Sequence, residues 1–218
     1  MRLRLFFLLA VICWASTLAG VTASVPMSRD SIMSLADPLS PRHDEEALVE
    51  ALRLVLDNPQ ASRADRGWCE VMLEMALKNR VGDKCADLDF VIADGATANI
   101  HGIEAPMTLI FFNDPDCLSC HQVKERLDTC ATLREMVARD ELVVLALCVG
   151  DDEHKWRVEG YPDYVINAFD VSRAVDEGEV YDLPTMPLFY LLDEEKRVLL
   201  KNEPSLNRVL RVLATGSR

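Results

Sequence analysis

Two cysteines separated by two residues, Cys117 and Cys120, are the side chains of this chain whose type and spacing best suit chemistry. They follow an apolar run, residues 107–112, and begin a segment with helical spacing, so we expect both sulfurs in the first turn of a helix. The unpaired N–H groups and the positive dipole end of that turn lower the pKa of Cys117 and favour its thiolate. A disulfide that closes so small a loop adds little stability. The spacing therefore favours redox exchange over a structural crosslink.

Two other interpretations of the cysteine pair stay open at this stage. Half of a zinc site is one, although zinc needs two more ligands and the chain has no second Cys-x-x-Cys pair. The other is covalent c-type haem attachment, because His121 completes the pattern Cys-x-x-Cys-His. Haem would need a second axial ligand and space on a helix whose apolar face is expected to pack on a sheet. His121 is more simply an exposed residue of the first helical turn.

The first 23 residues have the features of a secretory signal peptide. Arg2 and Arg4 precede an apolar segment, residues 5–14, and small residues before Ala23 offer a cleavage site. The apolar segment is shorter than the roughly 20 residues that span a bilayer, and no later segment is long and apolar enough. We therefore expect a periplasmic or otherwise exported protein, cleaved near Ala23, with no transmembrane span. Acylation of Cys13 is the alternative, but the bulky Ile12 disfavours it.

Cleavage would leave six of the seven cysteines, an even number that permits disulfides in an exported chain without proving them. A structural disulfide between Cys69 and Cys85 stays open, because the sequence does not settle their geometry. Cys130 and Cys148 lie on apolar faces and are expected to be buried. The net charge of −13, with no Lys/Arg cluster to relieve it, argues against nucleic acid and anionic membrane surfaces as partners.

The chain divides into a helical part and an α/β part near residue 80. Residues 24–40 show no convincing period and are expected to form a poorly ordered leader. A helix is expected from Ser40-Pro41 to Asn58, and a second from Ser62, whose capping-box partner is Asp65. Residues 24–80 therefore read as a leader and an N-terminal helical hairpin, which is too small to be stable alone.

From residue 81 onward, short β-type runs alternate with helical patterns, which indicates an α/β architecture. We expect an edge strand at 88–92, a central strand at 108–112, one helix over 117–138 and a buried strand at 142–149. A helical or loop region follows residues 151–152. A β-hairpin, 188–192 with 197–200, and a helix over 205–214 close the chain.

Three separated pieces of this second part resemble the thioredoxin-like superfamily, and more specifically the exported thiol-disulfide oxidoreductases of the TlpA/ResA type. Residues 82–88 (GDKCADL) resemble the opening motif of that family, residues 111–120 (FFNDPDCLSC) its active-site segment, and residues 181–187 (YDLPTMP) the loop that carries its cis-proline. The resemblance covers residues 81–216. It implies an α/β thioredoxin-like fold over 81–218, in which helices flank a central mixed β-sheet.

The resemblance also implies a role for each site residue. Cys117 would be the nucleophile that attacks a substrate disulfide, and Cys120 would resolve the mixed disulfide. Pro187 would be cis and face the cysteines, with Pro184 as the competing candidate, and Met186 would contact an extended substrate. The implied partners are a protein or peptide disulfide and an upstream thiol donor, with no metal or organic cofactor.

Several positions depart from the pattern of the family. Leu118-Ser119 replaces the Gly-Pro that thioredoxins commonly carry, and Phe111 stands where many of them bury an acidic residue. Asp114 and Asp116 place negative charge near Cys117, which opposes the helix dipole and favours a reductase over a strong oxidant. A thioredoxin-fold binding module without redox turnover remains a rival function.

Overall fold

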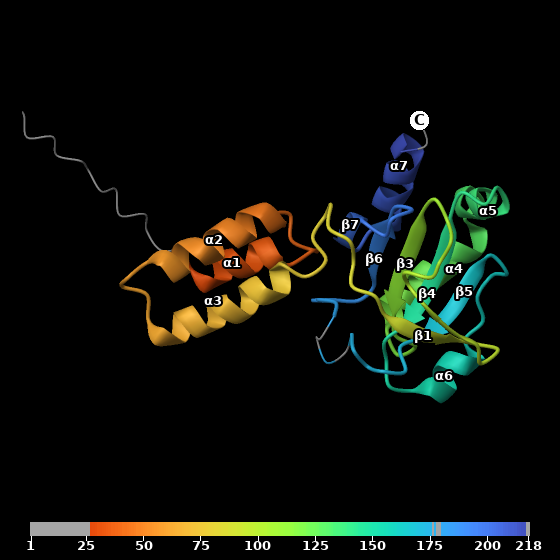
Figure 1. Ribbon diagram of the computed structural model, residues 1–218, viewed down its shortest axis with the longest axis horizontal. Coiled ribbons are helices and arrows are strands. Elements are labelled where there is room, and N and C mark those ends of the chain that lie inside the picture. The colour runs from red at the N-terminus through yellow and green to blue at the C-terminus, as the bar shows by residue number, and fades with distance from the viewer. Residues whose placement is uncertain (1–26, 176, 178–179, 217–218) are drawn as a thin grey trace, which may run out of the picture.

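The protein has a helical unit and a sheet unit that lie side by side along the long axis (Figure 1). The structure, a computed structural model, describes residues 27–175, 177 and 180–216. The predicted signal peptide, residues 1–23, falls outside these ranges. Within them, no helix is both long enough and apolar enough to cross a membrane.

Three helices build the helical unit: α1 (Arg29–Ala36), α2 (Glu45–Asp57) and α3 (Arg63–Ala76). Each helix begins at a side chain that accepts a hydrogen bond from a first-turn N–H, namely that of Ser28, Asp44 or Ser62. The three helices enclose a small core made of Ile32, Leu35, Leu48, Val49, Ala51, Leu52, Cys69 and Ala76.

The predicted leader and the predicted start of the next helix were both wrong. Residues 29–36 form α1, because Ile32 and Leu35 recur at helical spacing and are buried against the other two helices. Ser40 does not begin α2. Its side chain accepts from the Arg42 N–H and stabilises a turn, and the helix begins four residues later behind Asp44. The predicted helical hairpin is present as α2 and α3, and α1 adds a third helix to it.

The second unit is built on a seven-stranded mixed sheet with the strand order β2-β1-β5-β4-β3-β6-β7. The strands are β1 (Asp89–Ile92), β2 (Thr97–Asn99), β3 (Thr108–Asn113), β4 (Val143–Cys148), β5 (Val165–Phe169), β6 (Leu188–Leu192) and β7 (Val198–Glu203). Strands β3, β4 and β5 run parallel. Strands β1 and β6 pair antiparallel with β5 and β3, and the outermost strands β2 and β7 pair antiparallel with β1 and β6. The central strand β3 is buried along its whole length, which explains its continuous apolar sequence.

Helices pack on one face of this sheet. They are α4 (Leu118–Thr129), α5 (Ala131–Ala138), α6 (Glu153–Val158) and α7 (Leu206–Gly216). Phe111, Ala146 and Phe189 project from the sheet into one buried cluster with residues of α4, α5 and α7. The alternate strand residues, such as Phe112 and Tyr190, join a second cluster that the segments around residues 85–103 and 174–183 cover. The predicted α/β fold with helices packed on a mixed sheet is confirmed.

Two predicted elements of the sheet unit were incomplete. The segment 88–92 is not an edge strand, because β2 pairs with β1 on its outer side. The region after residue 152 contains both α6 and the strand β5. Asn167 interrupts the apolar pattern of β5, and its side chain accepts from the Trp156 Nε1–H at 2.7 Å, a contact the local sequence does not reveal.

The single helix predicted over residues 117–138 was also wrong, because Cys130 has an extended backbone and separates α4 from α5. Two backbone carbonyls near the end of α4 accept hydrogen bonds from side chains. The Tyr164 hydroxyl donates to Leu127 O, and the Arg134 guanidinium donates to Asp128 O. The break turns α5 so that Leu133 and other apolar residues enter the core.

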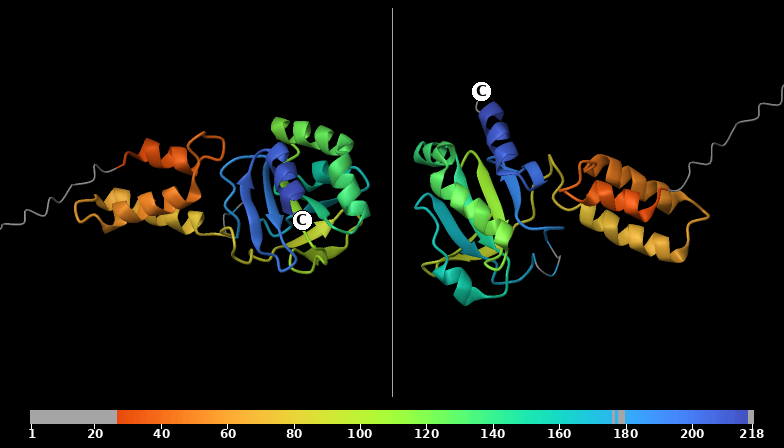
Figure 2. Two further views of the ribbon diagram at one scale, coloured as in Figure 1. Left: turned by 90° about the horizontal axis from the view of Figure 1, so that it is seen from above. Right: turned by 180° about the vertical axis from the view of Figure 1, so that it is seen from behind.

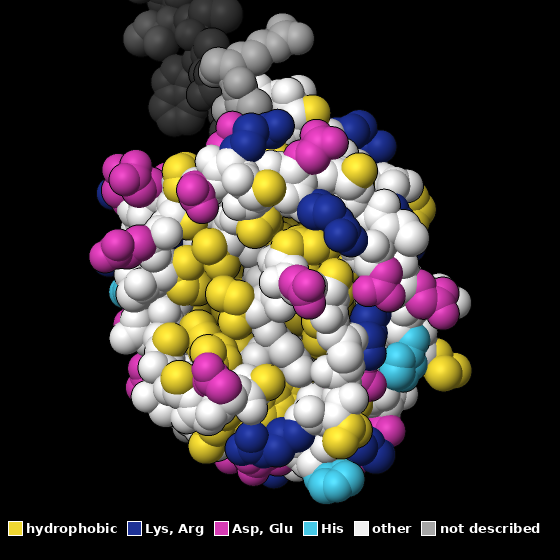
Figure 3. All heavy atoms as spheres, turned by 90° about the vertical axis from the view of Figure 1, so that its right-hand side faces the viewer, with side chains coloured by type: hydrophobic (Ala, Val, Ile, Leu, Met, Phe, Trp, Pro, Cys, Tyr) yellow, Lys and Arg dark blue, Asp and Glu magenta, His cyan; other side chains and the backbone are white. Residues whose placement is uncertain are grey.

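The helical unit lies beside the sheet edge that β7 forms, and two views agree on this placement (Figure 2). The opposite side of the sheet unit has an apolar hollow with acidic and basic side chains intermixed around it (Figure 3). The junction between the units is thus at β7 and at the segment that leads out of α3.

Candidate redox site

The cysteine pair lies where the central strand β3 gives way to α4. Cys117 is the N-cap of α4, and its Sγ accepts a hydrogen bond from the Cys120 N–H at 3.2 Å. The two sulfurs form a disulfide, with 5.2 Å between the Cα atoms. The first-turn N–H groups that face Cys117 would stabilise a thiolate there in the reduced protein.

The two cysteines differ in exposure. Cys117 is partly exposed at the surface, whereas Cys120 is only 4% exposed and packs in the core cluster with Val123 and Leu127. Leu118, between them, is 80% exposed and presents an apolar side chain beside the outer sulfur. An incoming disulfide can therefore reach Cys117 and not Cys120.

Acidic residues before the pair have partners that the sequence did not reveal. Asp116 forms an ion pair with Lys155 of α6, whose Nζ lies 2.7 Å from its carboxylate. This contact raises the pKa of Lys155. Asp114 accepts from the Asp116 N–H, and its carboxylate lies so close to Gly150 that a Cβ there would be 3.0 Å away. Lys155 offsets part of the negative charge that was predicted to oppose the helix dipole.

The loop before β6 contains the other predicted site residues. The Met186–Pro187 peptide bond is cis, and the Pro184 bond is not among the cis bonds. Met186 packs against the same core cluster as Cys117. The structure thus brings all four predicted site residues, Cys117, Cys120, Met186 and Pro187, to one region at the top of β3 and β6.

The other four cysteines in the described part of the chain are free thiols. Cys69 is buried in the core of the helical unit and Cys85 in the sheet unit, so the disulfide that the sequence left open is not formed. Cys148 is buried as expected, and burial raises the pKa of its thiol to about 12. Cys130 is only partly buried, contrary to expectation, because it occupies the break between α4 and α5.

The atoms that haem attachment would require are engaged in other bonds. The two sulfurs are bonded to each other, and His121 Nε2 lies 2.9 Å from the Pro115 carbonyl oxygen, to which it donates. Phe111 stacks on Phe189 inside the core, with ring centroids 5.2 Å apart, and leaves no polar group at its position. Among the described residues, no three His, Cys, Asp or Glu side chains gather as a metal site would require.

A half-buried polar network lies beside this site, at the end of β3 that leads to the cysteine pair. The Tyr161 hydroxyl donates to Asn113 Oδ1 at 3.1 Å, and Lys124 pairs with Glu159 and lies 5.2 Å from the centre of the Tyr161 ring. Asn113 ends β3 and Lys124 is one helical turn after Cys120. These residues link α4 to the segment after α6 and hold the cysteine turn in place.

Comparison with known proteins gave matches among solved structures. No family model matches the sequence, and no curated protein matches it. A thioredoxin-like protein from Bacteroides caccae shares 28% identity at a TM-score of 0.77, over 84% of this chain and 66% of the other. The C-terminal domain of an uncharacterized protein from Bacteroides fragilis shares 28% identity at a TM-score of 0.59, over 62% of this chain and 98% of the other. The present chain thus spans just under two thirds of the B. caccae chain.

The order of the strands, the cysteine pair after the central strand and the cis-proline before β6 define a thioredoxin-like protein. The B. caccae match extends over more of the chain than the sheet unit occupies, so it also includes residues that precede the sheet unit. In fold and in sequence the chain is thus similar to a thioredoxin-like protein of known structure.

Proposed function

We propose that the protein is an exported thiol-disulfide oxidoreductase of the TlpA/ResA type, which reduces protein or peptide disulfides through Cys117 and Cys120. The observation that carries this proposal is the asymmetric pair at the start of α4: a partly exposed sulfur at the N-cap, bonded to a buried one. A binding module that only used the groove beside the cis-proline would have no need of this pair.

The reaction begins with the reduced protein. The Cys117 thiolate attacks one sulfur of the substrate disulfide, a mixed disulfide forms, and the other substrate sulfur leaves as a thiolate that takes up a proton. Cys120, deprotonated, then attacks Cys117 Sγ. The Cys117–Cys120 disulfide closes and the second substrate sulfur leaves. Two electrons have passed from the protein to the substrate, and an upstream thiol donor must return them.

Met186 and Pro187 are proposed to contact the substrate chain beside the sulfurs. Their support is placement: the loop packs on the same cluster as Cys117, and an extended peptide can pair with backbone groups next to a reactive sulfur. The direction of electron flow is proposed as reduction, since Asp114 and Asp116 still leave the cysteine turn acidic even with Lys155 present. Export rests on the residues before Ala23.

Two single substitutions test the proposal. Cys120→Ser leaves the nucleophile without its resolving partner, so a peptide with an intact disulfide should accumulate as a stable mixed disulfide on Cys117 of the reduced variant, visible by mass spectrometry. Cys117→Ser should abolish both turnover and trapping. Catalysis would be ruled out, and the binding module favoured, by two negative results together: the parent protein does not reduce 5,5′-dithiobis(2-nitrobenzoate), and the Cys120→Ser variant traps no peptide.

A further inference from the structure

A groove separates the helical unit from the loop that carries the cis-proline. Its volume is about 730 Å³. One wall comes from α1 and α3, with Met33, Met72 and Met75, and the other from the sheet unit, with Pro184 and Thr185. The helical unit therefore supplies one wall of this cavity, and the sheet unit, with the loop before Met186 and Pro187, supplies the other.

The wall from the helical unit is rich in methionine. Met33 is 46% exposed, and Met72 and Met75, one turn apart on α3, are partly exposed. Methionine side chains are flexible and polarizable, and surfaces made of them adapt to apolar groups of different shapes. Such a wall suits an occupant whose apolar side chains vary from one molecule to the next.

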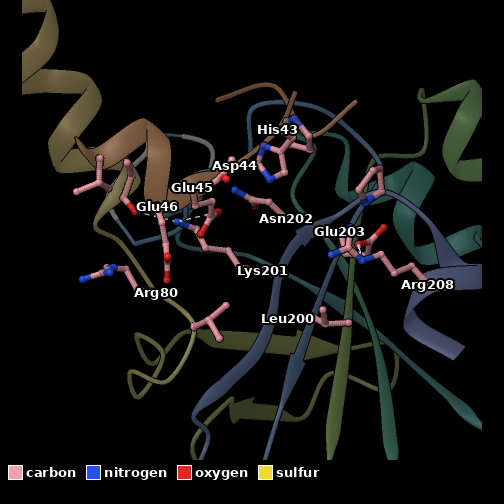
Figure 4. Close-up of a pocket in the computed structure, with 15 residues that line it drawn as sticks. His43, Asp44, Glu45, Glu46, Arg80, Leu200, Lys201, Asn202, Glu203 and Arg208 are labelled. Atoms are coloured by element: carbon pink, nitrogen blue, oxygen red, sulfur yellow. Dashed lines mark hydrogen bonds and ion pairs between the residues drawn. The ribbon is translucent and has the colours of Figure 1, made fainter. Parts of the chain in front are cut away.

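Polar groups close one end of the groove, at the place where it meets a second, polar pocket (Figure 4). Lys201 and Asn202 of β7 line both cavities. The Lys201 ammonium is already engaged, since it donates to the Ala76 carbonyl at 3.0 Å and lies 3.4 Å from a Glu45 carboxylate oxygen. Asn202 is different: it is 4% exposed, and its Oδ1 has no hydrogen-bond partner among the described residues.

Asn202 Oδ1 is enclosed by the protein, so a molecule in the groove does not reach it. The position of the groove indicates its occupant instead, because the groove lies beside the loop that precedes the cis-proline. In the proposed reaction this loop receives a polypeptide. The apolar side chains that flank the polypeptide's disulfide are the groups that a methionine wall accepts.

The groove also continues into the proposed active site. Pro184 and Thr185 line it, and the next two residues along the chain are Met186 and Pro187. A peptide that extends past Met186 from a sulfur bound to Cys117 would enter the groove after a short distance along this loop. The helical unit is thus placed to hold the segment that flanks the reacting disulfide.

We propose that this groove is a docking site for an apolar segment of the client polypeptide, next to the disulfide that the client presents. The inference rests on the proposed function for the identity of the client. Its chemical class is an extended peptide with apolar side chains, and the methionine wall of α1 and α3 recognises it. The helical unit is then a specificity element of the reductase.

Binding without redox chemistry tests the groove by itself. The probe is a fluorescein-labelled 15-residue peptide with its cysteines replaced by serine and a Leu/Val/Phe flank, and the matched peptide has a serine flank. Fluorescence anisotropy with the full mature protein should give a Kd about ten-fold lower for the apolar flank. Met72→Glu should abolish this difference, because a carboxylate would face the apolar segment.

Val71→Glu is the matched control. Val71 precedes Met72 on α3, is 61% exposed and is not part of the groove, so this substitution adds the same charge to the same helix. It should keep the ten-fold preference. Equal Kd values for the two peptides in the parent protein, or a loss of preference in Val71→Glu as large as in Met72→Glu, would overturn the proposal.

Kinetics separate this inference from the proposed function. With disulfide forms of the same peptides, the ratio of kcat/KM for the apolar-flank peptide to that for 5,5′-dithiobis(2-nitrobenzoate) should fall about ten-fold in Met72→Glu. A protein that binds the apolar peptide as described but reduces neither substrate would contradict the reductase and leave the groove in place. A reductase that ignores the flank would contradict the groove alone.

Discussion

The Lys155 ammonium of α6 lies 2.7 Å from the carboxylate of Asp116, one residue before Cys117, the proposed nucleophile. The two residues are 39 positions apart in the sequence. Their contact places a positive charge beside an acidic turn, where it stabilises a thiolate that the neighbouring carboxylates oppose.

Removal of this cation should make Cys117 less reactive. We expect Lys155→Ala to lower the rate at which iodoacetamide alkylates reduced Cys117 at pH 7 by roughly 1.5- to 2-fold, a small effect because the ion pair is exposed. Lys155→Arg should retain the parent rate. The difference between Ala and parent should shrink in 1 M salt, which screens exposed charges. An increased rate in Lys155→Ala would contradict this reading of the turn.

The junction between the units depends on an ammonium group that is almost completely buried. The Lys201 side chain is 2% exposed and that of Glu45 is 25% exposed. Glu45→Gln removes the partner charge from a buried ammonium and should lower the free energy of unfolding by about 2 kcal/mol. Lys201→Met replaces that ammonium with an apolar group of similar length and leaves a carboxylate that water can reach. It should therefore lower the free energy of unfolding by less than Glu45→Gln does.

Urea unfolding of the two variants, followed by circular dichroism, measures this asymmetry. Limited proteolysis of the segment between α3 and β1 offers a second readout, since a loosened junction should expose it in Glu45→Gln. A larger loss in Lys201→Met than in Glu45→Gln would show that the bond to the Ala76 carbonyl outweighs the charge pairing.

The buried thiol of Cys148 should make stability depend on alkaline pH. Its pKa is raised by burial from 9.0 to about 12. The folded protein thus keeps a proton that the unfolded chain releases first, so the stabilising effect is complete below pH 9 and is lost as the pH rises toward 12. This group contributes a slope of about −1.4 kcal/mol per pH unit in that range.

Cys148→Ala should make the decline shallower by about that amount. Urea unfolding between pH 8 and 11, with a phosphine reductant to keep all thiols reduced, gives both slopes. The alanine variant will be less stable at pH 8 because of the cavity, so the slope and not the starting value decides. Equal slopes for the parent and the alanine variant would show that the Cys148 thiol ionises as easily in the folded protein as in the unfolded chain.

The sequence was sufficient to predict where Cys117, Cys120, Met186 and Pro187 lie, because these residues are close in the chain or carry strong local signals. A buried parallel strand needs a continuous apolar run, which residues 108–112 supply, and the cysteine pair follows it directly. Pro187 is followed at once by the apolar strand β6. The features that the sequence did not predict depend on contacts between residues that are distant in the chain. The first is the ion pair of Lys155 with Asp116. The second is strand β5, in which Asn167 is bonded to Trp156.

The helical part shows the same division. The N-cap residues of α2 and α3 are Asp44 and Ser62, and the sequence predicted the first residue of α3 correctly. The predicted start of α2 was wrong, because Ser40-Pro41 has the residue types of a helix start but forms a turn. Helix α1 is short and buries only Ile32 and Leu35, too weak a periodicity to distinguish it from a leader. The groove between the units depends on tertiary packing throughout, and no local pattern marks it.

The reduction potential of the Cys117–Cys120 pair tests the central proposal most directly. The purified mature protein is equilibrated in dithiothreitol or glutathione redox buffers, and the thiols that become accessible in the native state are counted. The proposal predicts one reversible two-electron transition at Cys117 and Cys120, with a potential below about −230 mV, the lower end of the glutaredoxin range. A potential near −120 mV would instead mark an oxidant, and thiols that never interconvert with a disulfide would contradict redox function at this site.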